Sequence, residues 1–205
     1  MNDLLLKWIS EIHAISQNGL TYSKNEFDIE RYHRLDVLAK EMAAHFSDKD
    51  FNTVDQIFSV EKGYATPKLD VRAYIVKDNK LLLVKERADN LWTLPGGWVD
   101  VNESPSESVI REVLEETGYT VKIIRLLALW DKLKHDHPIQ WPHTYKMIFL
   151  CEIVSGDKKI NLEISDIDFF PMDQLPDLST PRVTSSQLNR LSELIASNTE
   201  ITSFD

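Results

Sequence analysis

The sequence is poor in cysteine and in positive charge. Its single cysteine, Cys151, cannot form an internal disulfide, and its place in an apolar stretch is typical of a small buried side chain. The 23 lysines and arginines are outnumbered by 33 aspartates and glutamates, which gives a net charge of −10. Such a balance disfavours a nonspecific hold on DNA, RNA or anionic membranes. We therefore expect no nucleic-acid partner.

Long apolar runs are also missing. No stretch approaches the roughly 20 apolar residues that a membrane-spanning helix needs. The start of the chain has no basic residue, and its first apolar run ends at Lys7, so a secretory signal is not indicated. We therefore expect a cytoplasmic protein without a membrane partner.

Glycine is scarce, with six residues in 205, yet two of them are adjacent in Leu94-Pro95-Gly96-Gly97. This order favours a tight loop with exposed backbone. The loop leads into the segment GWVDVNESPSESVIREVLEETGY, which spans residues 97–119. Five glutamates and one arginine fall within 14 residues of it. A helix with so many carboxylates either faces water or holds divalent cations.

The capping signals in this segment predict a helix from Pro105 to Thr117. Ser104 to Glu107 reads as a capping box with proline at the first helical position, and Gly118 supplies the left-handed residue that ends the helix. At 100° per residue, one side collects the apolar positions Val109, Ile110, Val113, Leu114 and Thr117. A different side collects Glu112, Glu115 and Glu116. We therefore expect a helix that is apolar toward a core and acidic toward an open site.

Carboxylates in this pattern suit Mg²⁺ or Mn²⁺, which prefer oxygen ligands. Such ions can clamp a pyrophosphate, neutralise charge at a bridging oxygen and lower the pKa of a bound water. The expected reaction is hydrolysis of a phosphoanhydride by attack of water on phosphorus. A Glu-rich helix is more commonly a solvated face, but the spacing, the flanking glycines and the arginine all favour the metal site.

Residues 97–119 resemble the Nudix hydrolase signature at its fixed positions, with Tyr119 standing where an aliphatic residue is usual. The resemblance covers residues 67–194 and implies an α/β/α sandwich with a mixed sheet. It also implies site roles. By this resemblance, Glu112, Glu115 and Glu116 bind the metal ions, with the carbonyl of Gly96 as a further ligand. Arg111 orients a signature glutamate, and Glu103 supports the loop and helix through a partner such as Arg111.

The first 62 residues differ in character from the rest. Helical spacing of apolar residues predicts a helix from Leu4 to about Ile15, a break at Asn18-Gly19, a second helix over about 24–46 and a third over 51–58. Such short helices bury little by themselves. We expect two domains, an N-terminal helical domain at 1–62 and a Nudix domain at 63–205. The helical domain should pack on the catalytic domain or a second subunit, and the family favours a homodimer.

Strand patterns begin at residue 70. Residues 71–76 and 80–85 flank Asp78-Asn79, which is a hairpin signal. A short strand is expected at 91–94, one or two strands at 119–129, and single strands at 145–153 and 167–170. Residues 184–196 have the pattern of a terminal helix.

Aromatic and basic side chains besides the signature's charged residues are candidates for substrate contacts. Trp98 and Tyr145, together with Trp130, could stack on a base, although each residue type is more often part of a core or a rim. Arg72 could hold a phosphate through a bidentate pair, and a structural salt bridge would explain it equally well.

The polar stretch 130–143 has the character of a substrate loop. His135, His137, His143 and Asp136 suggest zinc, but their spacing matches no standard ligand pattern, so a solvated loop is favoured. The catalytic base is not identified. Signature carboxylates could serve, and the candidates outside the signature are Glu152, Glu163, Asp166 and Asp168.

The whole arrangement resembles Nudix hydrolases of nucleoside diphosphates linked to another group X. We expect cleavage to a nucleoside monophosphate and phospho-X, with CDP-choline as the first candidate and ADP-ribose as the second. Two rival functions stay open. A Nudix-fold nucleotide sensor would bind without turnover. A hydrolase of RNA 5′ ends would need a basic groove, which the net charge disfavours.

Overall fold

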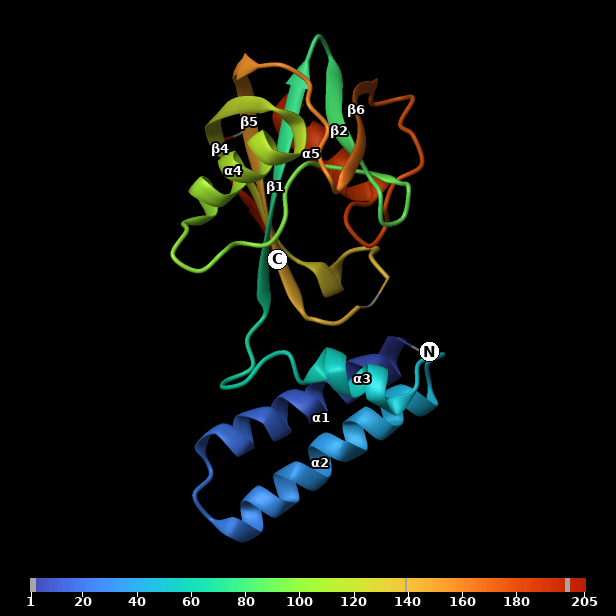
Figure 1. Cartoon of the computed structure of the whole chain (residues 1–205). Coiled ribbons are helices and arrows are strands. Elements are labelled where there is room, and N and C mark those ends of the chain that lie inside the picture. Colours follow the sequence, from blue (N-terminus) through green and yellow to red (C-terminus); the bar gives the residue numbers. More distant parts are fainter. Residues whose placement is uncertain (1–2, 139, 198–199) are drawn as a thin grey trace. The chain divides into compact units, whose positions relative to one another are not determined.

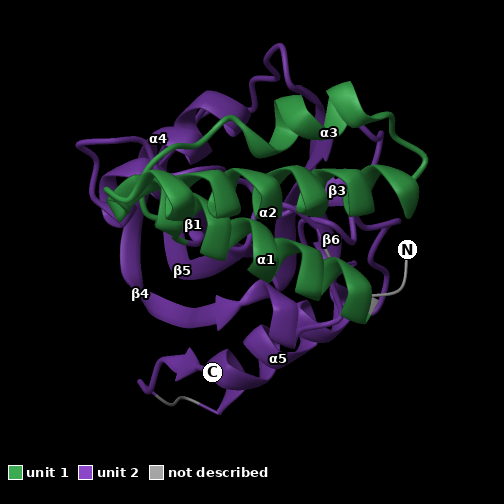
Figure 2. Ribbon diagram, turned by 90° about the horizontal axis from the view of Figure 1, so that it is seen from below, with its two compact units in different colours: residues 1–66 green, residues 67–205 purple. Residues whose placement is uncertain are grey.

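The computed structural model describes residues 3–138, 140–197 and 200–205. The chain forms two compact units, residues 1–66 and residues 67–205 (Figures 1 and 2). Unit 1 is helical, and unit 2 is a sheet with helices. Among the described residues, no helix combines the length and apolar character that a membrane crossing requires.

Unit 1 consists of α1 (Asp3–Tyr22), α2 (Glu26–His45) and α3 (Phe51–Phe58). Asn25 caps α2 by accepting hydrogen bonds from the N–H groups of Phe27 and Asp28. The predicted break at Asn18-Gly19 is wrong, because α1 continues to Tyr22. Gly19 instead lies against the ring of Tyr32, where an added Cβ would collide. The glycine therefore serves the close approach of α1 and α2.

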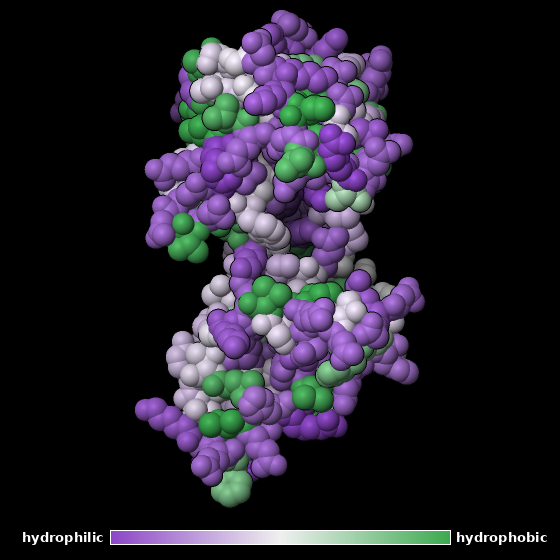
Figure 3. Space-filling view, viewed as in Figure 1, coloured by the Kyte–Doolittle hydropathy of each residue, from purple (hydrophilic) through white to green (hydrophobic). Residues whose placement is uncertain are grey.

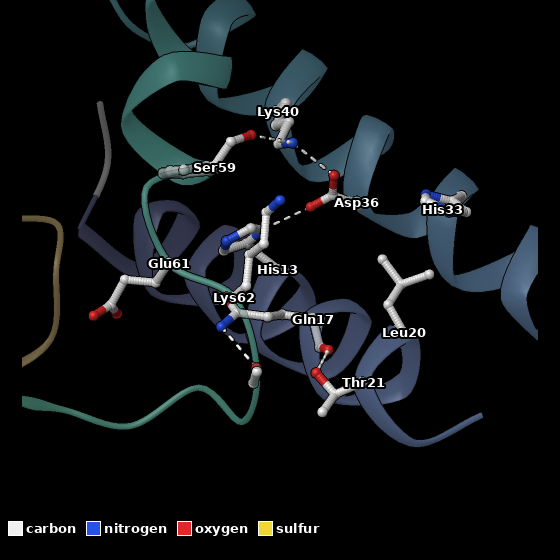
Figure 4. Close-up of a pocket in the computed structure, with 12 residues that line it drawn as sticks. His13, Gln17, Leu20, Thr21, His33, Asp36, Lys40, Ser59, Glu61 and Lys62 are labelled. Carbon is white, nitrogen blue, oxygen red and sulfur yellow. Dashed lines mark hydrogen bonds and ion pairs between the residues drawn. The ribbon is translucent and has the colours of Figure 1, made fainter.

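Charged groups hold the helices of unit 1 together. Lys40 Nζ pairs with Asp36 at 2.6 Å and with Asp55 at 2.7 Å, while His13 Nδ1 lies 2.8 Å from Asp36. The lysine is buried with both carboxylates as neighbours, which raises its pKa although burial alone would lower it. The group lies beside a cavity of about 460 Å³ bounded by α1, α2 and the segment after α3 (Figure 4). This ionic cluster supplements the small apolar core that three short helices can make.

The strands of unit 2 are β1 (Lys68–Lys77), β2 (Lys80–Glu86), β3 (Trp92–Thr93), β4 (Tyr119–Asp131), β5 (Thr144–Gly156), β6 (Ile164–Pro171) and β7 (Ser203–Phe204). Its helices are α4 (Pro105–Thr117) and α5 (Ser185–Ala196), with a 3₁₀ turn at Lys132–Lys134. The predicted hairpin is confirmed. Asp78 and Asn79 both have positive φ, and Val76 pairs with Leu81.

The sheet is mixed, in the order β3-β2-β1-β5-β4-β7, with β6 paired to β2. β1 and β5 run parallel, whereas β4 and β5 run antiparallel with several bulges. The residues 119–129 thus belong to one long strand. The two-residue strand β7, which pairs in parallel with β4, was not expected from the sequence. A two-residue strand carries no readable periodicity.

Each face of the sheet is covered by one helix, as the sandwich prediction requires (Figure 1). Val71, Ala73 and Ile75 of β1 belong to a core that includes Val109 and Val113 of α4. The alternate face, with Tyr74, belongs to a second core that includes Leu188 and Leu191 of α5. Strands buried on both faces explain the continuous apolar runs in the sequence.

Helix α4 begins and ends where the sequence indicated. Ser104 and Glu107 form the capping box, and Gly118 has φ of 77°. The predicted division of α4 into a buried apolar side and an open acidic side is partly wrong. Leu114 is 49 % exposed, and Glu116 is only 5 % exposed. The acidic side is therefore not uniformly open, because its last glutamate turns in toward the loop that precedes the helix.

Candidate functional site

The loop before α4 is fastened to β1 by backbone hydrogen bonds. Ala73 N–H donates to the Pro95 carbonyl at 2.9 Å, and Val71 N–H donates to the Gly97 carbonyl at 2.8 Å. Gly96 between them has φ of 135°, and an added Cβ would collide with the Val71 carbonyl oxygen. Glycine is therefore required at this position. The loop turns the N–H of Gly96 toward Glu116, whose Oε2 accepts it at 2.7 Å.

Two signature glutamates are held in low-dielectric surroundings. Burial raises the pKa of Glu116 to about 8, although Arg72 and the Gly96 N–H act in the opposite sense. Burial likewise raises the pKa of Glu112, with Arg111 opposing it. A Cβ on Gly97 would lie 3.0 Å from both carboxylate oxygens of Glu112. The Glu112 carboxylate therefore sits directly behind the backbone of Gly97.

Arg111 contacts three glutamates of the signature. Its Nε and Nη2 donate to Glu103, at 2.9–3.1 Å. Its Nη1 donates to Glu112 at 2.9 Å and to Glu115 at 3.1 Å. The contact that the resemblance implied between Glu103 and Arg111 is present. Arg111 thus ties the loop, through Glu103, to two glutamates on α4.

Within the described part of the chain, no three or more His, Cys, Asp or Glu side chains are grouped so that they could hold one metal ion. The contacts of Arg111 explain this for the signature. Glu112 and Glu115 turn to the guanidinium, while Glu116 turns to Gly96. The three carboxylates lie on neighbouring positions of one helix but do not converge on a common point in this arrangement.

A cavity of about 400 Å³ adjoins the signature loop. Its lining is dominated by charged side chains with one large aromatic. The lining residues are Asp70, Arg72, Ala88, Asp89, Gly97, Trp98, Lys132, Gln140, Thr144, Lys146, Pro181 and Arg182. Because Gly97 is part of this wall, the cavity lies next to the Glu112 carboxylate. We call it the basic cavity.

Asp70 organises the cations at the base of the basic cavity. Arg72 donates to both carboxylate oxygens of Asp70, at 3.0 and 2.8 Å, and Lys146 Nζ donates to it at 2.9 Å. All three side chains are buried. The two cations hold the pKa of Asp70 well below its ordinary range, although burial alone would raise it. Lys146 and Asp70 face each other because β1 and β5 pair at these residues.

The three candidate substrate residues occupy different places. Trp98 is 49 % exposed and lines the basic cavity. Arg72 also lines it but is engaged by Asp70 and by the Leu94 carbonyl at 3.0 Å, the salt-bridge arrangement left open above. Tyr145 is 40 % exposed and follows the strand alternation, so it lies on the sheet face opposite to its neighbour Lys146. It is not part of the cavity wall described here.

Trp130 is not available for base stacking. Its side chain is fully buried, and its Nε1 donates to Ser203 Oγ at 3.1 Å. It belongs to the core beneath α5. The unexpected strand β7 supplies its hydrogen-bond partner.

The histidines of the 130–143 stretch do not form a zinc site within the described residues. His135 lies 3.3 Å from Asp205, His143 lies 2.9 Å from Asp131, and His137 Nδ1 donates to the Thr180 carbonyl at 2.7 Å. Each ring therefore has a separate structural partner. Residue 139 of this stretch lies outside the described residues.

None of the acids proposed as bases outside the signature lines the basic cavity. Lys122 pairs with Glu152, and Lys158 pairs with Asp166. Asp168 accepts the N–H of Phe169. Glu163 lines a second hollow, which shares Ala88 and Arg182 with the basic cavity.

The stretch 130–143, interpreted above as a substrate loop, supplies Lys132 and Gln140 to the cavity wall. Sequence reasoning missed the other charged residues of the basic cavity and its rim: Asp70, Glu86, Asp89, Lys146 and Arg182. Glu86 pairs with Arg182 at 3.1 Å and acts electrostatically on Glu116. A lysine inside an otherwise apolar strand was a readable signal for Lys146. The others could not be found without the fold, because they come from separate strands and loops.

Two family models match the chain. One, described as the NUDIX domain, matches residues 66–189. The other, described as a UDP-X-like, N-terminal oligomerisation domain, matches residues 3–58. Together they cover both structural units.

Individual proteins agree with these matches. YjhB of Bacillus subtilis (strain 168), provisionally named an ADP-ribose pyrophosphatase, is 43 % identical over 97 % of both chains. The ADP-ribose pyrophosphatase of Methanocaldococcus jannaschii is 32 % identical over 57 % of this chain and 69 % of its own. The crystal structure of a UDP-X diphosphatase covers both chains fully, with a TM-score of 0.66 and 37 % identity. The chain therefore belongs to the Nudix hydrolase family.

Proposed function

We propose that the protein is a metal-dependent pyrophosphohydrolase that splits a nucleoside diphosphate linked to a group X into a nucleoside monophosphate and phospho-X. One observation carries the proposal. The Glu112 carboxylate of the signature lies directly behind Gly97, and Gly97 lines a cavity rich in cations. A diphosphate at this wall would have carboxylates on one side and basic side chains on the other.

The donor chemistry fits Mg²⁺ or Mn²⁺. Glu116 and Glu112 are carboxylates whose ionised forms are disfavoured by burial. A nearby divalent cation would favour those ionised forms. Glu112, Glu115 and Glu116, with the Gly96 carbonyl, would hold the ions once Glu112 and Glu115 turn from Arg111. Bound ions would neutralise charge on the diphosphate and acidify an attacking water.

The chain's own residues have separate tasks in this reaction. Arg111 and Glu103 position Glu112 and Glu115, and the Gly96 N–H positions Glu116. In the chemical step the oxygen of water forms a bond to one phosphorus, and the bridging P–O bond breaks. Its electron pair stays on the bridging oxygen, and a signature carboxylate accepts the proton of the water.

The candidates for X keep their sequence-based order, with CDP-choline first and ADP-ribose second. The names of the relatives support ADP-ribose and a UDP-linked compound as further members of the class. All of them share the diphosphate that the site would cleave. Trp98 at the cavity wall is placed to cover a base or sugar.

A substrate panel tests the proposal. Purified protein with Mg²⁺ or Mn²⁺ is given CDP-choline, CDP-ethanolamine, ADP-ribose, UDP-linked sugars, NADH and dNTPs, and phosphate is measured after phosphatase treatment. We expect turnover of at least one linked nucleoside diphosphate, and Glu116→Gln should lower kcat by at least about 10²-fold. The matched control is Glu193→Gln, an exposed glutamate on α5. Tight nucleotide binding without turnover of any compound would favour a sensor instead.

We further propose that unit 1 associates with a second copy of the chain. The family model for residues 3–58 is described as an oligomerisation domain. Helix α1 exposes about half of Leu4, Trp8 and Ile15 and two thirds of Tyr22. These four positions fall on one narrow stripe at 100° per residue. Apolar side chains interrupt the polar surface of this unit (Figure 3), as expected for a face that a partner covers.

A further inference from the structure

The basic cavity carries more positive than negative charge. Four cations line it: Arg72, Lys132, Lys146 and Arg182. The anions that meet them are Asp70, shared by Arg72 and Lys146, and Glu86 and Asp89, which both contact Arg182. Lys132 Nζ donates to the neutral amide oxygen of Gln140 at 2.7 Å. The positive charge of Lys132 therefore meets an uncharged partner in the cavity wall.

Two of the four cations, Arg72 and Lys146, are buried, and Lys132 is partly exposed. Lys146 is 2 % exposed, and burial lowers its pKa to about 8. Asp70 opposes this shift, whereas Arg72 and Lys132 add to it. Burial lowers the pKa of Lys132 to about 8, with Arg72 and Arg182 adding to the shift and Asp70 opposing it. Asp70, Glu86 and Asp89 offset part of the repulsion among these cations, but one positive charge more than the number of anions remains. An anionic ligand of suitable size would neutralise the excess positive charge of the cavity wall.

The position of the lysines separates them from the glutamates. Lys146 lies on the sheet face that α5 covers, together with Asp70 and Arg72, whereas α4 packs on the opposite face. The signature loop lies between the lysines and the glutamates. Gly97 of this loop lines the basic cavity, and the Glu112 carboxylate lies beside the same residue. An anion held by the lysines would thus be near the signature without using its carboxylates.

We propose that Lys132 and Lys146 form a phosphate subsite that binds the oxygens of a diphosphate directly and without a metal ion. The subsite deepens the proposed function, because it rests on a diphosphate being the group that the enzyme holds. It makes Lys132 and Lys146 binding residues that the signature does not contain. The cavity of about 400 Å³ has room for more than the diphosphate, so the subsite would anchor a larger linked compound.

Titration with inorganic pyrophosphate in the presence of EDTA tests the subsite, with isothermal calorimetry as readout. We expect the wild-type protein to bind, and Lys132→Gln to raise Kd by about tenfold or more, as loss of a charge-assisted contact would. Lys134→Gln is the matched control. It removes the same charge from an exposed residue of the same 3₁₀ turn, outside the cavity wall, and should leave Kd unchanged.

Lys146→Met provides a second variant, with circular dichroism to confirm folding. It should also raise Kd by at least about tenfold. If this buried replacement fails to fold, the comparison of Lys132→Gln with Lys134→Gln decides. Absence of metal-free binding in the wild-type protein would overturn the proposal. Equal weakening by Lys132→Gln and Lys134→Gln would overturn it too, because it would show a response to overall charge.

Hydrolysis measured on the same proteins separates this inference from the proposed function. With a substrate from the panel, Lys132→Gln should raise KM more than it lowers kcat, since it removes binding common to ground and transition states. Lysine-dependent pyrophosphate binding with no compound hydrolysed would leave the subsite standing and reject the function. Hydrolysis with the Kd and KM of Lys132→Gln equal to those of Lys134→Gln would reject the subsite alone.

Discussion

The Glu116 carboxylate accepts a hydrogen bond of 2.7 Å from the backbone N–H of Gly96, 20 residues earlier in the chain. Both partners are buried. The bond fixes the last turn of α4 against the loop that precedes the helix. It depends on a backbone conformation that glycine adopts readily, so the loop and the glutamate depend on each other.

Alanine at the two loop glycines should have different consequences. Gly96→Ala places a Cβ against the Val71 carbonyl at φ of 135°. We expect it to lower the free energy of unfolding by about 2 kcal/mol or more. Gly97→Ala meets the end of the flexible Glu112 side chain at 3.0 Å. It should cost little stability but lower kcat/KM by about tenfold, because it displaces Glu112.

Urea unfolding and steady-state kinetics on both variants measure these effects. Each variant acts as the control for the other, since both add one methyl group to adjacent residues. The interpretation of the loop would be contradicted if Gly97→Ala were the less stable protein, or if it kept the wild-type kcat/KM.

Arg111 and Glu103 should act as one unit. In the variant Arg111→Lys, a single ammonium group replaces the planar guanidinium. The ammonium cannot contact Glu103, Glu112 and Glu115 together. We expect Arg111→Lys to lower kcat/KM by about 10- to 100-fold. Glu103→Gln should have a smaller effect of the same kind. The double variant should resemble Arg111→Lys rather than the product of the two.

A double-mutant cycle in kcat/KM and in Mg²⁺ affinity checks this coupling. The control is Lys122→Gln, which breaks an exposed pair with Glu152 outside the site. Additive effects of Arg111→Lys and Glu103→Gln would show that the two residues act independently, contrary to the contacts seen here.

Local signals in the sequence were sufficient for most of the fold. The capping box and Gly118 defined α4, and Asp78-Asn79 defined the β1–β2 hairpin. These signals act between residues close in the chain. The break expected at Gly19 was wrong because the reason for that glycine lies in Tyr32, a residue of the next helix. Propensity yields to packing at such positions.

In the site, too, contacts within one short segment could be predicted, whereas contacts between separate elements could not. Arg111 and its contact with Glu103 followed from the signature, whose members lie on one short segment. The grouping of the cations in the basic cavity did not follow, because Lys132, Lys146 and Arg182 meet only when separate elements assemble. Burial of Glu116 was also missed, since helical periodicity describes one helix and contains nothing about the loop that covers it.

A charge on the α1 stripe should weaken self-association. Trp8 is 52 % exposed and lies on the same stripe as Leu4 and Ile15. Trp8→Glu would force a carboxylate into the proposed contact, and we expect the dissociation constant to rise by at least about tenfold. Trp8→Phe keeps an apolar ring and should retain association. Analytical ultracentrifugation over a concentration series compares the two variants. A monomeric wild-type protein, or equal association of both variants, would contradict the proposal.

Protonation of His137 should contribute to the loss of stability in acid. Its Nδ1 donates to the Thr180 carbonyl, and burial lowers its pKa from 6.5 to about 4. The unfolded chain therefore binds a proton below pH 6.5 that the folded protein does not bind until about pH 4. The stabilisation is complete above pH 6.5 and declines as the pH falls through this window.

Replacement by asparagine keeps an N–H donor and removes the titrating ring. Between pH 7 and pH 5, His137→Asn should lose less free energy of unfolding than the wild-type protein, by about 1 kcal/mol, a value reduced for partial solvation. Urea unfolding at both pH values in EDTA provides the comparison. His33→Asn, at an exposed histidine of α2, should follow the wild-type curve. Parallel losses in wild type and His137→Asn would mean that His137 is solvated and binds its proton equally well in both states.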